Sequence, residues 1–102
     1  MQNTDWKNLP FGYMKTDHNI RCLYRDGKWR KLEVTSSEYI NIHIASTCLH
    51  YGQEAFEGMK AHRGKDGKIR LFRWRDNAKR MRDTALGIKL AVVPEEIFKE
   101  AV

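Results

Sequence analysis

The segment LHYGQEAFEGMK, residues 49–60, places a tyrosine, a phenylalanine, two glycines and two glutamates near the middle of the chain. Glycine inside a helix or strand costs stability unless the backbone needs a positive φ or a close approach. Gly52 and Gly58 therefore indicate a shaped corner, with Tyr51 and Phe56 directed into a pocket. Packing of both aromatic side chains in a core is an equally good reading of this pattern. The segment is the functional centre from which we read the chain outward.

Two β-hairpins are predicted on either side of this segment. Residues 19–24 and 28–34 are β-favouring runs joined by a turn that contains Asp26-Gly27, the dipeptide favoured in tight hairpins. The same turn signal returns at Gly64-Lys65-Asp66-Gly67, between expected strands at 58–63 and 68–73. Two such hairpins in a short chain predict a mainly antiparallel sheet.

Residues 39–44 alternate apolar and polar side chains, which predicts a third strand with Ile40, Ile42 and Ile44 on one face. Ser46 and Thr47 are candidates to cap a short helical turn that ends near Tyr51.

Two helices are expected in the C-terminal part of the chain. The first runs over 77–86 with Asp76 as N-cap, and its core-facing stripe consists of Ala78, Met81, Ala85 and Ile88. The second opens at Pro94 and carries Ile97, Phe98 and Ala101 towards a core. The sequence therefore predicts the α+β class: an antiparallel sheet with two β-hairpins, flanked by helices.

Residues 1–18 show no regular period, because Pro10 and Gly12 interrupt them. Their apolar side chains, which include Trp6 and Tyr13, are expected to drape over a core.

Length and composition suit one domain, residues 1–102, with an apolar share of 41% and a mean hydropathy of −0.69. This polar balance favours a domain that a partner or further chain completes. The net charge of +6 leaves a polyanion as a possible partner. No nucleic-acid motif accompanies the charge, and no apolar run approaches the roughly 20 residues that span a bilayer, so neither nucleic acid nor a membrane is an expected partner. Cys22 and Cys48 lack metal-type spacing and are expected to be free thiols in a reducing cytoplasm.

Basic residues are frequent where the second hairpin meets the first long helix. They are Arg70, Arg73, Arg75, Lys79, Arg80 and Arg82. Arg80 lies beside the apolar stripe of the helix, from where a guanidinium can reach over a cleft and grip a phosphate. Solvated charges on a helix face are the alternative. No ordered catalytic or metal-binding motif is present, and Glu54 and Glu57 are candidates for ordinary surface acids.

Three blocks of sequence resemble the branched-chain amino acid aminotransferases, a family of fold type IV pyridoxal-phosphate enzymes. The blocks are residues 49–60, the run DGKIRLFR at 66–73 and the run DNAKRM at 76–81. The likeness extends back through the hairpin at 26–29, residues 13–17 and Asp5-Trp6, so it covers nearly the whole chain.

The resemblance implies that this chain is the N-terminal small domain of a longer enzyme that works as a homodimer in the cytoplasm. It implies that Arg80 binds the phosphate of pyridoxal 5'-phosphate. It also implies that Phe56 and Gly58 line the substrate side-chain pocket, and that Tyr51 is contributed to the pocket of the neighbouring subunit. The full protein would transfer the amino group of leucine, isoleucine or valine to 2-oxoglutarate.

The sequence departs from the family pattern at two positions. Trp74 stands where proline is usual, and His62 stands where an aromatic residue is usual. The family's Schiff-base lysine belongs to a C-terminal domain, and no lysine of this chain occupies its position. The resemblance therefore implies no catalytic residue and no metal ligand here, and a chain that is inactive by itself. The alternative is a stand-alone, non-catalytic binding or interaction module derived from that domain.

Overall fold

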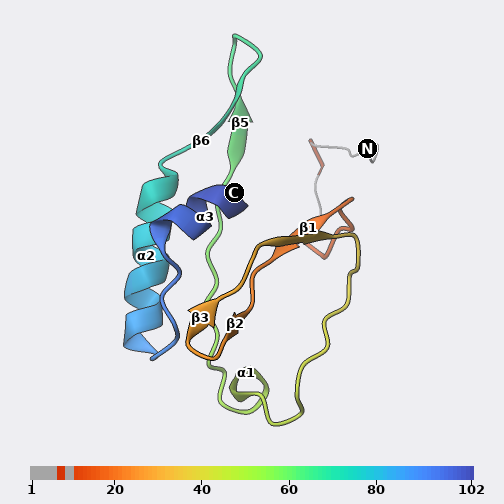
Figure 1. The fold of residues 1–102 in the computed structure, drawn as a ribbon. Coiled ribbons are helices and arrows are strands. Elements are labelled where there is room, and N and C mark those ends of the chain that lie inside the picture. The colour runs from red at the N-terminus through yellow and green to blue at the C-terminus, as the bar shows by residue number, and fades with distance from the viewer. Residues whose placement is uncertain (1–6, 9–10) are drawn as a thin grey trace. The chain divides into compact units, whose positions relative to one another are not determined.

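The computed structural model describes residues 7–8 and 11–102, and the chain divides into two compact units, Met1–Ile42 and His43–Val102. The first unit contains two pairs of strands, and the second contains a third pair together with helices (Figure 1). All three pairs are antiparallel, which confirms the expected α+β class. Within the described residues each pair is a separate two-stranded sheet.

The first unit is built on one long, interrupted hairpin. Strands β1 (Asn19–Arg21) and β4 (Glu33–Thr35) form its open end, and β2 (Tyr24–Arg25) and β3 (Lys28–Trp29) form its closed end. Asp26 and Gly27 both have positive φ, 54° and 75°, as a type I′ turn requires. The predicted first hairpin is therefore confirmed. Tyr24 and Trp29 pack edge to face across it, with ring centroids 5.1 Å apart.

Residues 11–18 contain no helix or strand, as expected, but their apolar side chains do not drape over a core. Phe11, Tyr13 and Met14 are all exposed. The segment instead makes polar contacts with Glu38. The Lys15 ammonium lies 3.6 Å from the Glu38 carboxylate, and a hydrogen bond with that carboxylate raises the pKa of Tyr13. Trp6 and Pro10 lie outside the described residues.

The strand predicted at 39–44 is wrong. Tyr39, Ile40 and Ile44 are exposed, and no ladder forms among the described residues here. The backbone bonds to nearby side chains instead: the Tyr39 amide donates to the Ser37 hydroxyl at 3.2 Å, and the Ala45 amide donates to His43 Nδ1 at 3.0 Å. Such local bonds compete with strand pairing.

The second unit begins with α1 (Thr47–His50), the predicted short helical turn. Strands β5 (Ala61–Arg63) and β6 (Ile69–Leu71) then form the predicted second hairpin, with His62 opposite Arg70. Asp66 organises its turn, because its carboxylate accepts hydrogen bonds from the Lys68 amide at 3.1 Å and from both terminal nitrogens of Arg70.

Helices α2 (Trp74–Gly87) and α3 (Glu95–Ala101) pack against each other, and they carry the buried residues Ala78 and Ala85 on α2 and Phe98 on α3. The predicted apolar stripes are thereby confirmed. Asp76 is not the N-cap: the helix begins earlier, after Arg73 in a left-handed conformation, and Asp76 lies in the first turn as the ion-pair partner of Arg73 at 2.6 Å. An acid there is favoured by the helix dipole.

Trp74, where the resemblance leads one to expect proline, begins α2 and takes part in this packing. Its ring stacks on Phe98 of α3 with centroids 6.4 Å apart, and the Arg75 guanidinium lies 4.7 Å from the Trp74 ring centroid. The departure from the family pattern therefore gives α2 an aromatic contact with α3.

Candidate functional site

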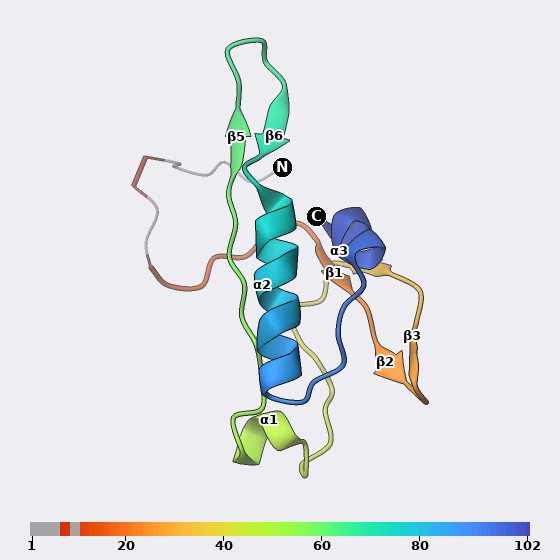
Figure 2. The same cartoon turned by 90° about the vertical axis from the view of Figure 1, so that its left-hand side faces the viewer.

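An extended segment lies along α2 and forms the candidate site with it (Figure 2). The segment, residues 53–58, follows the turn in which Gly52 has a φ of 61°. At one end the side-chain amide of Gln53 donates to the backbone carbonyl of Ile88 at 2.9 Å. At the other end the side-chain amide of Asn77 donates to the backbone carbonyl of Gly58 at 3.0 Å. The segment therefore runs antiparallel to the helix and is fixed to it at both ends.

Side chains of this segment alternate in exposure. Residues 53, 55, 57 and 59 are partly buried, whereas 52, 54, 56, 58 and 60 are exposed. This is the period of an extended backbone, in which successive side chains point to opposite sides. Glu57 therefore faces α2, and Phe56 faces away from it.

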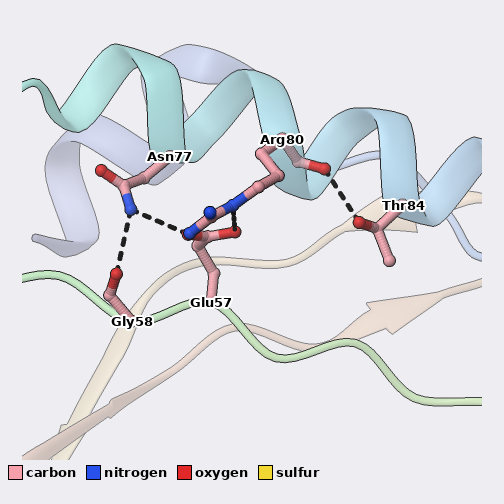
Figure 3. A network of polar contacts seen from close by, with 5 residues as sticks. All are labelled: Glu57, Gly58, Asn77, Arg80 and Thr84. Atoms are coloured by element: carbon pink, nitrogen blue, oxygen red, sulfur yellow. Dashed lines mark hydrogen bonds and ion pairs between the residues drawn. The ribbon is translucent and has the colours of Figure 1, made fainter.

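Glu57 is the centre of a polar network with α2 (Figure 3). Its side chain is only 4% exposed. It accepts hydrogen bonds from Asn77 at 2.8 Å and from Arg80 Nε at 2.9 Å and 3.1 Å, and Arg80 Nη2 donates to it as well. These donors satisfy a carboxylate that would otherwise be costly to bury. The reading of Glu57 as an ordinary surface acid is wrong.

The charges in this network stabilise each other. Hydrogen bonding to Arg80 lowers the pKa of Glu57, with a smaller contribution from Asn77, and the same pair raises the pKa of Arg80. Glu57 is therefore an anion and Arg80 a cation over the whole physiological range of pH.

Arg80 remains 69% exposed despite this pairing. Its contacts with Glu57 use Nε and Nη2, and among the residues described Nη1 has no hydrogen bond. Beside it an open hollow of about 290 Å³ is lined by Phe72, Arg73, Asp76, Asn77 and Arg80. The hollow lies over the first turn of α2, where the helix dipole favours an anion.

The rest of the basic cluster is largely paired. Arg70 binds Asp66, Arg73 binds Asp76, and Arg75 lies 3.4 Å from Glu95. Lys79 and Arg82 line a second hollow, of about 540 Å³, between α2 and residues 92–95. The cluster is therefore not one continuous cationic surface.

The structure does not gather the other predicted site residues into a pocket with Arg80. Tyr51 and Phe56 are 84% and 92% exposed, so their alternative role in a core is wrong. The close approach expected at Gly58 is not found, because a Cβ there would lie 3.5 Å from the Phe56 ring, which is an ordinary van der Waals contact. Phe56 and Gly58 thus lie together on the side of the segment that faces away from α2, and their role toward a substrate stays a prediction.

Sequence reasoning missed Glu57 and Asn77 as site residues. The sequence did contain a signal, the alternation of side chains along an extended backbone. In such a segment Glu57 shares a side with Ala55 and Met59, whose small and apolar side chains indicate burial.

Among the described residues no group of histidines, cysteines or acids could hold a metal ion. None of the described helices is long and apolar enough to cross a membrane. Cys22 and Cys48 are free, as expected.

Comparison with known proteins finds no matching family model but several close relatives. The chain is 48% identical over 101 residues to a branched-chain-amino-acid aminotransferase of Haemophilus influenzae, and 42% identical over 101 residues to one of Helicobacter pylori. It is also 40% identical over 100 residues to the chloroplastic branched-chain-amino-acid aminotransferase 5 of Arabidopsis thaliana. These matches cover 99%, 99% and 96% of this chain but only 29%, 30% and 24% of the relatives.

Proposed function

Because this chain is homologous to the branched-chain aminotransferases over nearly its whole length, we propose that it is the N-terminal small domain of such an enzyme. The complete polypeptide transfers the amino group of leucine, isoleucine or valine to 2-oxoglutarate. The observation that carries this proposal is 48% identity over 99% of the chain to a relative named a branched-chain-amino-acid aminotransferase. We place the proposed enzyme in the cytoplasm, as a homodimer.

Pyridoxal 5'-phosphate is the cofactor of the proposed enzyme, and the residues beside α2 fit its phosphate. The Arg80 guanidinium is exposed, is fixed on one edge by Glu57, and borders an open hollow at the first turn of α2. A guanidinium binds phosphate through paired hydrogen bonds, and a helix N-terminus adds a favourable dipole. Asp76 in the same hollow is neutralised by Arg73 at 2.6 Å. Arg80 is thus the proposed phosphate anchor.

Phe56, Gly58 and Tyr51 are the proposed substrate contacts. Phe56 and Gly58 present an apolar surface of the kind that an aliphatic side chain contacts, while the exposed Tyr51 ring is free to reach the pocket of the neighbouring subunit. Their exposure supports a site that other parts of the enzyme complete, because contiguous apolar side chains are normally covered.

The work of these residues is binding and orientation. The bound cofactor supplies the electron sink for amino-group transfer. Arg80 holds one end of it, and Phe56 with Gly58 positions the substrate side chain and excludes water from it. A lysine able to move the proton would belong to the proposed C-terminal domain, so residues 1–102 alone are expected to be inactive.

An amino-transfer assay tests the proposal on two samples, the complete polypeptide and residues 1–102. With pyridoxal 5'-phosphate and 2-oxoglutarate, the complete polypeptide is expected to form glutamate from leucine, isoleucine or valine. Residues 1–102 are expected to form none. The alternative, a stand-alone binding module, predicts that the natural coding frame stops at Val102. The complete polypeptide is then residues 1–102 itself, and it transfers no amino group.

A further inference from the structure

We infer that Glu57 is a positioning residue, which with Asn77 fixes the orientation of Arg80 so that its remaining edge meets the cofactor phosphate. The inference rests on the proposed function and assigns a role to an acid that the sequence did not distinguish. Glu57 makes no contact with the phosphate in this role. It acts through the guanidinium alone.

Burial is asymmetric within the Glu57–Arg80 pair. The Glu57 side chain is 4% exposed, whereas that of Arg80 is 69% exposed. An exposed arginine has many rotamers, and holding it in one costs side-chain entropy at the moment of binding. A buried carboxylate that bonds both Nε and Nη2 holds the guanidinium plane before the ligand arrives. Nη1 has no hydrogen bond among the described residues and is left for a ligand.

Glu57 is itself held in place by Asn77. Asn77 lies one helical turn before Arg80, and its amide donates to the Glu57 carboxylate at 2.8 Å and to the Gly58 carbonyl at 3.0 Å (Figure 3). The amide therefore fixes both the side chain of Glu57 and the backbone after it. Because Gly58 is a proposed substrate contact, the same bonds link the phosphate anchor to the substrate side of the segment.

Another pair in the same unit offers a comparison. Asp66 and Arg70 also form a doubly bonded pair, at 2.6 Å and 3.0 Å, but both side chains are about half exposed and belong to one hairpin. That pair stabilises a turn locally. The Glu57 pair joins two segments 23 residues apart in the chain and has its acid buried.

Binding measurements on the complete polypeptide, freed of cofactor, test this role. The ligands are pyridoxal 5'-phosphate and pyridoxal, which differ only in the phosphate group. The variants are Glu57→Ala and its isosteric counterpart Glu57→Gln, with Asp66→Ala as the matched control that breaks the hairpin pair. The thermal unfolding temperature of each variant is measured alongside.

A positioning role predicts that Glu57→Ala weakens binding of pyridoxal 5'-phosphate by about tenfold, the value of one charge-assisted hydrogen bond. Affinity for pyridoxal changes less than about twofold, since the substitution leaves the rest of the site intact. Glu57→Gln, which keeps one acceptor oxygen, lies between wild type and Glu57→Ala. Asp66→Ala leaves both affinities unchanged.

Equal losses for the two ligands would show a structural role only and overturn the inference. So would tighter binding of pyridoxal 5'-phosphate, which would mean that the Glu57 charge merely opposes the phosphate. If Glu57→Ala does not fold, the isosteric Gln variant decides by the same comparison. Wild-type protein that binds neither ligand would overturn the proposed function, and this inference with it.

Discussion

At the scale of single residues, Glu57 shows that the burial of an acidic side chain depends on which side of an extended backbone it lies. In the sequence it stands three positions from Glu54 and looks equivalent to it. In the structure Glu54 is exposed, whereas the Glu57 side chain is 4% exposed and bonded to two side chains of α2. Burial of an ionised carboxylate is tolerated only with such partners. Loss of the Glu57 carboxylate should therefore affect the folded protein more than loss of the Glu54 carboxylate.

Acid is expected to weaken this network. The pKa of Glu57 is lowered below its ordinary value of 4.5 by Arg80 and Asn77. A carboxylate whose pKa is lowered by folding stabilises the folded protein above its unfolded pKa, and this contribution is lost as pH falls through the folded pKa. The stability difference between wild type and Glu57→Gln should thus be constant from neutral pH down to about 4.5 and shrink below it.

Urea unfolding of both proteins over a series of pH values measures this difference. Glu54→Gln, which removes an exposed carboxylate from the same segment, is the control and should shift the urea midpoint little. A gap between wild type and Glu57→Gln that persists unchanged at the most acidic pH would contradict the ionised pair.

Arg80 was identifiable from sequence because its surrounding motif resembles a family, but its partner was not. Motif residues are matched by type, whereas the Glu57–Arg80 contact depends on how an extended segment lies against a helix 23 residues later. The roles proposed for Tyr51 and Phe56 rest on the same motif resemblance as that of Arg80. Their exposure was not foreseen, because aromatic side chains beside glycines suit either a core or a pocket.

At the scale of elements, the hairpins and helices followed from local chemistry. The Asp26-Gly27 and Asp66-Gly67 turns have the positive φ values that their residue types favour, at 54°, 75° and 81° for Asp26, Gly27 and Gly67. The false strand at 39–44 has a different origin. Alternation of isoleucines predicts a strand only if a neighbour pairs with it, and sequence periodicity does not report whether that neighbour exists.

The contact between α2 and α3 depends on Phe98. This side chain is 7% exposed and stacks on Trp74. Phe98→Ala is expected to lower the free energy of unfolding by about 3 kcal/mol, since it removes a large buried side chain and leaves a cavity. Chemical denaturation of the complete polypeptide measures this loss.

Glu100→Ala is the control, because Glu100 lies on the same helix and is exposed. It should change the free energy of unfolding by less than about 0.5 kcal/mol. If Phe98→Ala were as mild as this control, α3 would not depend on the aromatic contact.

At the scale of the whole molecule, few apolar side chains of the described residues are buried and many are exposed. Only Ala78, Ala85 and Phe98 are buried among them, while large apolar side chains such as Phe11, Phe56 and Phe72 are exposed. The low mean hydropathy indicated a domain that other chain or a partner completes, and this exposure supports the same proposal. Which of these surfaces would be covered in the proposed enzyme was not predictable, because composition does not report what packs against an exposed side chain.

The central claim is that Arg80 of this chain holds the phosphate of pyridoxal 5'-phosphate. The most direct test is the dissociation constant of that cofactor for the complete polypeptide and for its Arg80→Ala variant. Arg82→Ala is the control, since it removes the same charge from an exposed position on the same helix. We predict that Arg80→Ala weakens binding on the order of ten- to a hundredfold and that Arg82→Ala does not. Equal dissociation constants for wild type and Arg80→Ala would contradict the account.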